Sequence, residues 1–201
     1  VYTFAGEKVH RTPHTITWNP IAVEKQGFRH FMAKEIYEQP AVVRTCLEAY
    51  LDLDWTPGSK QSPCKLNLPA SIYADLEHIQ IVACGTSLHA GMVGKYLLEE
   101  LAQIPTAIQY ASEFRYSPPP LMPNTLTIGI TQSGETADTL AAVEIEQSRR
   151  ADKESKYHSR LLAITNRTDS AITRVVDCVI DTHAGMEIGV AATKTFMGQL
   201  M

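Results

Sequence analysis

Residues 126–136 have the sequence LTIGITQSGET, and this stretch decides the fold that we expect for the chain. Its first half, Leu126–Ile130, is an apolar run bounded by polar residues, which predicts a buried strand. The residues ADTLAAV at 137–143 follow the turn and predict the start of a helix. Hydroxyls, an amide and a glycine are therefore gathered where a strand passes into a helix.

This turn suits an anion, because the first amide groups of a helix lack partners within the helix and its dipole favours negative charge there. Neutral donors rather than a lysine would hold the anion, which points to a phosphate group. The alternative is that Ser133 and Thr136 cap the helix, since serine and threonine are favoured at that position.

Apolar runs and helical segments alternate after residue 69. Strands are predicted at Ile79–Ala83, Ala107–Tyr110, Leu126–Ile130, Leu161–Thr165 and Val176–Ile180. Helices are predicted mainly at His89–Leu101, Ala137–Arg149 and Ser170–Arg174. This alternation predicts an α/β fold in which about five parallel strands carry helices on both faces.

Open parallel sheets bind ligands beyond the carboxyl ends of their strands. Three polar turns are expected at that edge, namely CGTS at 84–87, TQSGET at 131–136 and HAGMEIGV at 183–190. Two such turns side by side favour a phosphate site over simple caps, and a small-molecule pocket is the default hypothesis. No GxGxxG or GxxxxGK[ST] motif occurs, so dinucleotide binding and nucleoside triphosphate chemistry are disfavoured.

Five residues near these turns could in principle act as nucleophiles or proton carriers: Cys84, His89, Glu135, His183 and Glu187. A structural thiol is the favoured interpretation of Cys84, and a surface or packing role that of His89. Glu135 would also complement the start of a helix, and the position of His183 leaves its role open. The sequence supports no catalytic pairing among them.

The composition excludes several classes of protein. A net charge of -4, without a basic block, disfavours nucleic acid as a partner. No apolar stretch could span a bilayer and no signal peptide opens the chain. Cys46, Cys64, Cys84 and Cys178 are widely spaced, which favours reduced thiols in a cytoplasmic protein over a disulfide framework or a metal site.

The first third of the chain has a different character. Residues 1–20 are expected to form a linker, and residues 54–67 a loop. Apolar residues recur at helical spacing over 22–50, and Pro40 is expected to separate two helices there. Because the chain opens on Val1 and ends in what resembles the start of a helix, we expect a fragment of a longer protein.

Several motifs occur in the order found in one family. They are CGTS at 84–87, ASEFRY at 111–116, QSGETADTL at 132–140 and EIGVAATK at 187–194, with FMAKEIYEQP upstream at 31–40. In these motifs the chain resembles the glutamine–fructose-6-phosphate aminotransferase (isomerizing) family, the glucosamine-6-phosphate synthases. A QSGET turn alone would indicate only the wider class of sugar isomerase (SIS) domains.

The resemblance implies a flavodoxin-like SIS sandwich preceded by a helical extension. It divides the chain into the end of a glutaminase domain with its linker (1–20), a helical lead-in (21–68) and a first SIS domain (69–201). The family transfers ammonia from glutamine to fructose 6-phosphate and forms glucosamine 6-phosphate, on the route to UDP-N-acetylglucosamine. No metal or organic cofactor is implied.

Carried over position by position, the resemblance implies a sugar-phosphate site made of Thr86, Ser87, Thr131, Gln132, Ser133, Thr136 and Val190. The family commonly has serine where Thr131 and Ala192 stand, so a hydroxyl is kept at the first position and lost at the second. Its ring-opening lysine, glutamate base and histidine belong to a second SIS domain and the C-terminal tail. We therefore assign no catalytic residue here, and neither Glu135 nor Lys194 takes those roles.

The resemblance also implies partners: the glutaminase and second SIS domains of the same chain, and a second copy in a homodimer. The fragment is expected to be inactive by itself. Two other functions stay open, a non-enzymatic SIS sensor of sugar phosphates and a stand-alone sugar-phosphate isomerase or deglycase. A sensor would need a basic DNA-binding module, which residues 1–70 do not suggest, and an isolated isomerase would not need the segment at 31–40.

Overall fold

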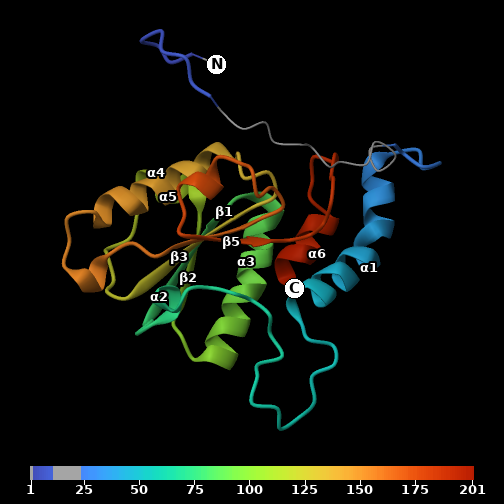
Figure 1. Ribbon diagram of the computed structural model, residues 1–201, viewed down its shortest axis with the longest axis horizontal. Coiled ribbons are helices and arrows are strands. Elements are labelled where there is room, and N and C mark those ends of the chain that lie inside the picture. The colour runs from blue at the N-terminus through green and yellow to red at the C-terminus, as the bar shows by residue number, and fades with distance from the viewer. Residues whose placement is uncertain (1, 11–23) are drawn as a thin grey trace.

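The computed structural model describes residues 2–10 and 24–201 and contains one five-stranded sheet (Figure 1). The strands lie in the order β2-β1-β3-β4-β5, and every neighbouring pair is parallel. Their bounds are β1 His78–Ala83, β2 Thr106–Tyr110, β3 Thr125–Thr131, β4 Leu161–Thr165 and β5 Cys178–Asp181. The predicted α/β fold with a parallel sheet is confirmed.

Helices cover both faces of this sheet. The α-helices of the described residues are α1 Phe31–Tyr50, α2 Ala70–Tyr73, α3 Gly85–Leu97, α4 Ala111–Tyr116, α5 Ala137–Arg150 and α6 Lys194–Leu200. A π-helical turn, Leu98–Ala102, continues α3, and short 3-10 turns occur at Ser155–Tyr157 and Ile172–Arg174. The helix predicted over Ser170–Arg174 is thus a single 3-10 turn, and α4 was not expected.

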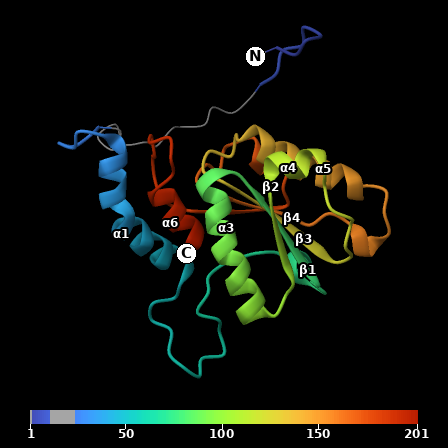
Figure 2. The same cartoon turned by 180° about the vertical axis from the view of Figure 1, so that it is seen from behind.

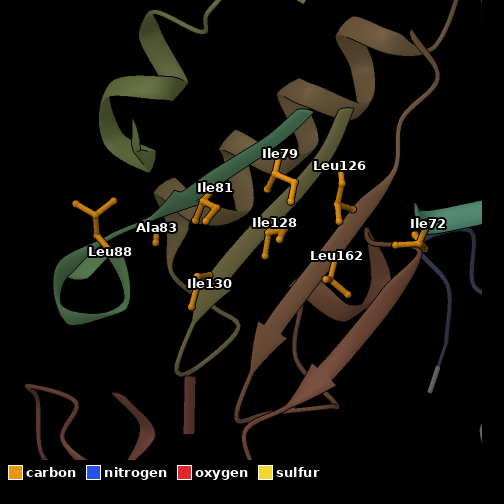
Figure 3. Packing of buried hydrophobic residues seen from close by; sticks show 9 residues of the cluster. All are labelled: Ile72, Ile79, Ile81, Ala83, Leu88, Leu126, Ile128, Ile130 and Leu162. Atoms are coloured by element: carbon orange, nitrogen blue, oxygen red, sulfur yellow. The ribbon is translucent and has the colours of Figure 1, made fainter. Parts of the chain in front are cut away.

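The core has two halves because successive side chains of a strand point to opposite faces. On one face Ile79, Ile81 and Ala83 of β1 pack with residues of β3 and with Leu88 of α3 (Figure 3). On the other face Val82 packs with Phe114 of α4 and with residues of α5. Burial on both sides explains why β1 and β3 are nearly continuous apolar runs.

The helix α1 is a correction to the sequence analysis, because it continues through Pro40 instead of ending there. Proline has no amide hydrogen to donate within the helix, and such residues bend a helix when they do not break it. α1 indeed changes direction about halfway along its length in both views (Figures 1 and 2). The exposed position of Pro40 leaves its ring clear of the core.

The same views place α6 between α1 and α3, so α1 reaches the rest of the molecule through α6 and the segment before it (Figure 2). Residues 2–10 form a turn closed by a bridge between Tyr2 and Lys8. Most of the linker predicted at 1–20 lies outside the described residues. In the part of the chain that the structure describes, no helix has both the length and the apolar character needed to cross a membrane.

Candidate functional site

The three polar turns meet at the carboxyl edge of the sheet. β1 leads into α3 on one face and β3 leads into α5 on the other, so the chain diverges between these two neighbouring strands. Ligands of doubly wound sheets bind at such a switch point. A cavity of about 430 Å³ lies here, lined by Cys84, Gly85, Thr86, Ser87, Gln132, Ser133, Thr136, Glu187, Gly189, Val190, Ala191 and Ala192.

The second turn, Thr131–Thr136, is held by hydrogen bonds among its own residues. The buried Thr131 hydroxyl lies 2.9 Å from the Thr136 hydroxyl and accepts the Gly134 amide at 3.3 Å. The Ser133 hydroxyl accepts the Glu135 amide at 3.1 Å. Thr131 therefore shapes the turn from behind, while Gln132, Ser133 and Thr136 line the cavity.

Gly134 makes this turn possible in two ways. Its φ of +67° lies in the left-handed region, which disfavours residues with a Cβ atom. A Cβ atom would also overlap the side chain of Ser170. The turn therefore packs directly on the connection between β4 and β5, to which the Glu135 carboxylate is bonded by accepting the Ala171 amide at 2.7 Å.

Both helices that start at the cavity lack a side-chain cap. α5 begins after Thr136 and α3 after Cys84, and neither N-cap side chain bonds to the first turn of its helix. The capping alternative for Thr136 is therefore not what the geometry shows. First-turn amides of two helices, next to serine and threonine hydroxyls, form an arrangement able to bind a phosphate.

The first turn contributes Thr86 and Ser87. Thr86 is half-buried, whereas Ser87 is buried and accepts a hydrogen bond from Nε2 of Gln199 at 3.0 Å. Because that bond uses the oxygen of Ser87, its own hydroxyl proton stays available for another acceptor. Gln199 lies on α6, so the sequence analysis had no means of connecting it with the first turn.

The third turn is held by Glu187, which the sequence analysis considered as an acid–base group. Its Oε1 atom accepts the backbone amides of Thr193, Lys194 and Thr195 at 2.9, 3.0 and 3.2 Å. This carboxylate therefore caps the start of α6, and its bonds are structural. Val190, by contrast, is fully exposed at the cavity rim.

The two histidines lie apart from this cavity. His89 is exposed on α3 and contributes nothing to its lining. His183 has a positive φ of 47°, and its Nδ1 atom lies 3.5 Å from Oδ2 of Asp181. It lines a second, adjoining cavity of about 650 Å³, which shares Gln132, Ser133 and Glu187 with the first.

Two side chains that the sequence analysis missed hold the third turn from outside. Asn166 accepts the Thr182 hydroxyl and the Ala184 amide, both at 2.9 Å, and donates to the Gly185 carbonyl at 2.6 Å. Its place directly after β4, at the ligand-binding edge, was the signal that could have identified it. Glu35 of α1 accepts the amides of Ile188 and Gly189.

No catalytic constellation or metal centre is assembled from these groups. Among residues 2–10 and 24–201, no three histidine, cysteine or acidic side chains are grouped so that they could hold a metal ion. Hydroxyls, amides and small side chains make up most of the cavity lining. Glu187 also lines it, with Oε1 bonded to the start of α6 and Oε2 buried without a hydrogen-bond partner.

Comparison with known proteins identifies the family to which this chain is similar. The SIS domain family matches residues 72–201. Glutamine–fructose-6-phosphate aminotransferase (isomerizing) of Thermosynechococcus vestitus is 65% identical over 201 residues, which are 100% of this chain and 32% of that relative. The corresponding enzyme of Aquifex aeolicus is 43% identical, over 100% of this chain and 30% of its own length. The chain thus spans about a third of the length of the curated relatives it matches.

Solved structures agree with this result. The C-terminal domain of glucosamine-fructose-6-phosphate aminotransferase from Francisella tularensis superimposes with a TM-score of 0.72 at 37% identity, covering 88% of this chain and 46% of that one. Tagatose-6-phosphate ketose/aldose isomerase from Escherichia coli has a TM-score of 0.61 at 17% identity, covering 86% and 45%, and shows the fold alone. The resemblance noted in the sequence is confirmed.

Proposed function

The chain belongs to the SIS domain family, and on that premise we propose that its three turns bind a sugar phosphate as the first SIS domain of a glutamine–fructose-6-phosphate aminotransferase. The observation that carries this proposal is the uncapped pair of helix starts, α3 and α5, at one cavity beside the hydroxyls of Ser133 and Thr136. Fructose 6-phosphate and glucosamine 6-phosphate are the proposed ligands.

Each predicted residue has a place in this proposal. Ser133, Thr136 and the first amides of α5 hold the phosphate, with Thr131 keeping the turn in shape. Thr86, Ser87 and Gln132 supply further donors from the cavity wall, and Val190 borders the sugar. The methyl group of Ala192 lines the cavity where a serine hydroxyl would bond the sugar, so we expect one contact fewer there.

The whole enzyme is part of the same proposal. It transfers ammonia from glutamine to fructose 6-phosphate in the cytoplasm, and its glutaminase and second SIS domains supply the nucleophile and the proton-moving groups. We also propose that domain boundaries lie at residues 20 and 68 and that the enzyme forms a homodimer. Relatives that carry this enzyme's name are about three times as long as the chain, which supports the presence of further domains in the whole enzyme.

The alternatives have weaker support. A stand-alone sugar-phosphate isomerase has the same fold, but the matching isomerase of Escherichia coli is only 17% identical. A sugar-phosphate sensor would use the same cavity without catalysis. Relatives bearing the aminotransferase name align with the whole length of the chain, including α1, and therefore favour the enzyme.

Calorimetric titration with fructose 6-phosphate and glucosamine 6-phosphate tests the phosphate site. We expect the double variant Ser133→Ala, Thr136→Ala to bind at least about tenfold more weakly, since a hydrogen bond to a charged group contributes roughly 1.5–3 kcal/mol. Ser148→Ala is the matched control, because its hydroxyl bonds the Glu144 carbonyl on the exposed part of α5. Equal affinity of wild type and double variant would overturn the assignment.

A further inference from the structure

One face of α1 packs against the segment between β5 and α6. Glu35, Glu38, Val42, Cys46 and Tyr50 recur at intervals of three or four residues, which places them on the same side of the helix. Val42 and Cys46 pack with Ala184 of that segment. α1 is therefore built into the third turn of the site rather than being a spacer in front of it.

Four side chains of this face bond to that segment. Tyr50 donates to the Asp181 carbonyl at 2.7 Å, and the Cys46 thiol to the Thr182 carbonyl at 3.0 Å. Glu38 accepts a hydrogen bond from the Lys194 ammonium group at 2.7 Å. These three bonds hold the two ends of the segment, at β5 and at the start of α6.

Glu35 makes the fourth contact, in the middle of the segment. Its side chain is buried, with 2% of its surface exposed. Oε1 accepts the Ile188 amide at 2.5 Å and the Gly189 amide at 3.1 Å, and Oε2 also lies 3.1 Å from the Gly189 nitrogen. A buried carboxylate is costly unless it is hydrogen-bonded, so these backbone amides are its compensation.

The fit between Glu35 and Gly189 leaves no room for a side chain. A Cβ atom on Gly189 would overlap Oε2 of Glu35, although the backbone there does not have a positive φ. An alanine at this position would therefore have to displace the carboxylate from its bonds to the Ile188 and Gly189 amides. Of the four contacts from α1, the one made by Glu35 reaches a residue that lines the cavity.

We propose that Glu35 is a positioning residue that fixes the sugar-facing wall of the cavity, Gly189 to Ala192, and so selects sugar phosphates over bare phosphate. This inference rests on the proposed function. The opposite wall is the 131–136 turn, whose hydrogen bonds join its own residues to one another and to the connection between β4 and β5. Loss of Glu35 should therefore move one wall and leave the phosphate-binding wall unchanged.

The test compares Glu35→Gln with the wild-type 201-residue chain in titrations with fructose 6-phosphate and with inorganic phosphate. Glutamine retains the size of the side chain, but one carboxylate oxygen, which accepts a hydrogen bond, becomes an NH2 group, which only donates. That group would face the N–H group of Gly189. We expect about tenfold weaker binding of the sugar phosphate, the loss typical of one charge-assisted hydrogen bond, and inorganic phosphate affinity within about twofold of wild type.

Two further variants separate positioning from a general loss of stability. Tyr50→Phe removes another α1 contact, to the backbone carbonyl of Asp181, which does not line the 430 Å³ cavity, and should leave both affinities unchanged. Gly189→Ala disturbs the same contact as Glu35→Gln from the opposite side and should reproduce its selective loss. Thermal melting of every variant identifies those that are folded at the titration temperature.

Amide hydrogen exchange supplies a readout that does not depend on a ligand. In Glu35→Gln the Ile188 and Gly189 amides should exchange faster, while those of Gly134 and Glu135 keep their wild-type rates. Unchanged exchange at 188 and 189, or an equal loss of affinity for both ligands, would overturn the positioning role. A wild-type chain that binds no sugar phosphate, with the exchange difference present, would instead refute only the proposed function.

Discussion

Two walls of one cavity are built in different ways. The turn at 131–136 is held by three hydrogen bonds among its own six residues. The loop at 183–192 is held partly by its own Glu187, which accepts the Thr193, Lys194 and Thr195 amides. It is also held by two side chains outside it, Asn166 at a separation of 18 residues and Glu35 at a separation of 154. The first wall is a local structure that docks on the fold, whereas the second takes its shape from the fold.

This difference shows what each wall tolerates. A turn bonded mainly within itself depends on the identity of a few adjacent residues, together with the β4–β5 connection on which it packs. A loop held from outside depends on residues that touch no ligand. Substitutions in the two walls and labelling of a thiol on α1 test this contrast.

Gly134→Ala should have the largest effect. It places a Cβ atom at a φ of +67° and against Ser170, and strain with overpacking should lower the free energy of unfolding by about 4 kcal/mol. Gly94→Ala in α3 is the control, because no atom lies within 4 Å of the added Cβ and alanine favours a helix. Urea unfolding measures both. A loss at Gly134 no greater than at Gly94 would contradict the strict geometry of the turn.

Glu187→Ala should come next. It leaves the Thr193, Lys194 and Thr195 amides without their acceptor, and we expect a loss of about 2–3 kcal/mol in the free energy of unfolding. Glu135→Ala removes an exposed carboxylate that accepts a single amide and should cost much less. Urea unfolding measures both variants. Equal losses in the free energy of unfolding would show that both walls depend on their carboxylate to the same extent.

The smallest effect is on thiol reactivity, with no change in stability. Burial raises the pKa of the Cys46 thiol, and the nearby Asp181 carboxylate raises it further. Less thiolate is therefore present at a given pH, and the thiol donates to the Thr182 carbonyl. Mass spectrometry after iodoacetamide treatment near neutral pH should find Cys64, which is exposed, alkylated well before Cys46. Early labelling of Cys46 would indicate that α1 separates readily from the segment before α6.

The contrast between the walls also explains what the sequence could reveal. Buried strands such as Leu126–Ile130 can be predicted from their mainly apolar residues, and the parallel sheet follows from their alternation with helices. The 131–136 turn could also be predicted from the sequence, because its hydroxyls and glycine are adjacent in the chain. Even there, the sequence did not distinguish Thr131, which supports the turn from behind, from Ser133, which lines the cavity.

Contacts across the fold were beyond the reach of the sequence. Pairing of Glu35 with Gly189 depends on where α1 lies, and the periodicity of α1 alone does not give its position. The continuation of α1 through Pro40 was missed for a related reason, since packing against α6 stabilises a helix that local propensity would interrupt. The role of Glu187 likewise became evident only with α6 in place.

The contact made by Glu35 has a consequence for how such a site diversifies. Glu35 binds the loop through the backbone amides of Ile188 and Gly189, and its close approach restricts the side chain at position 189. The loop is therefore held in position without the side chains of Val190, Ala191 and Ala192. Evolution can exchange them, and with them the chemistry offered to a sugar, while the backbone stays anchored to α1.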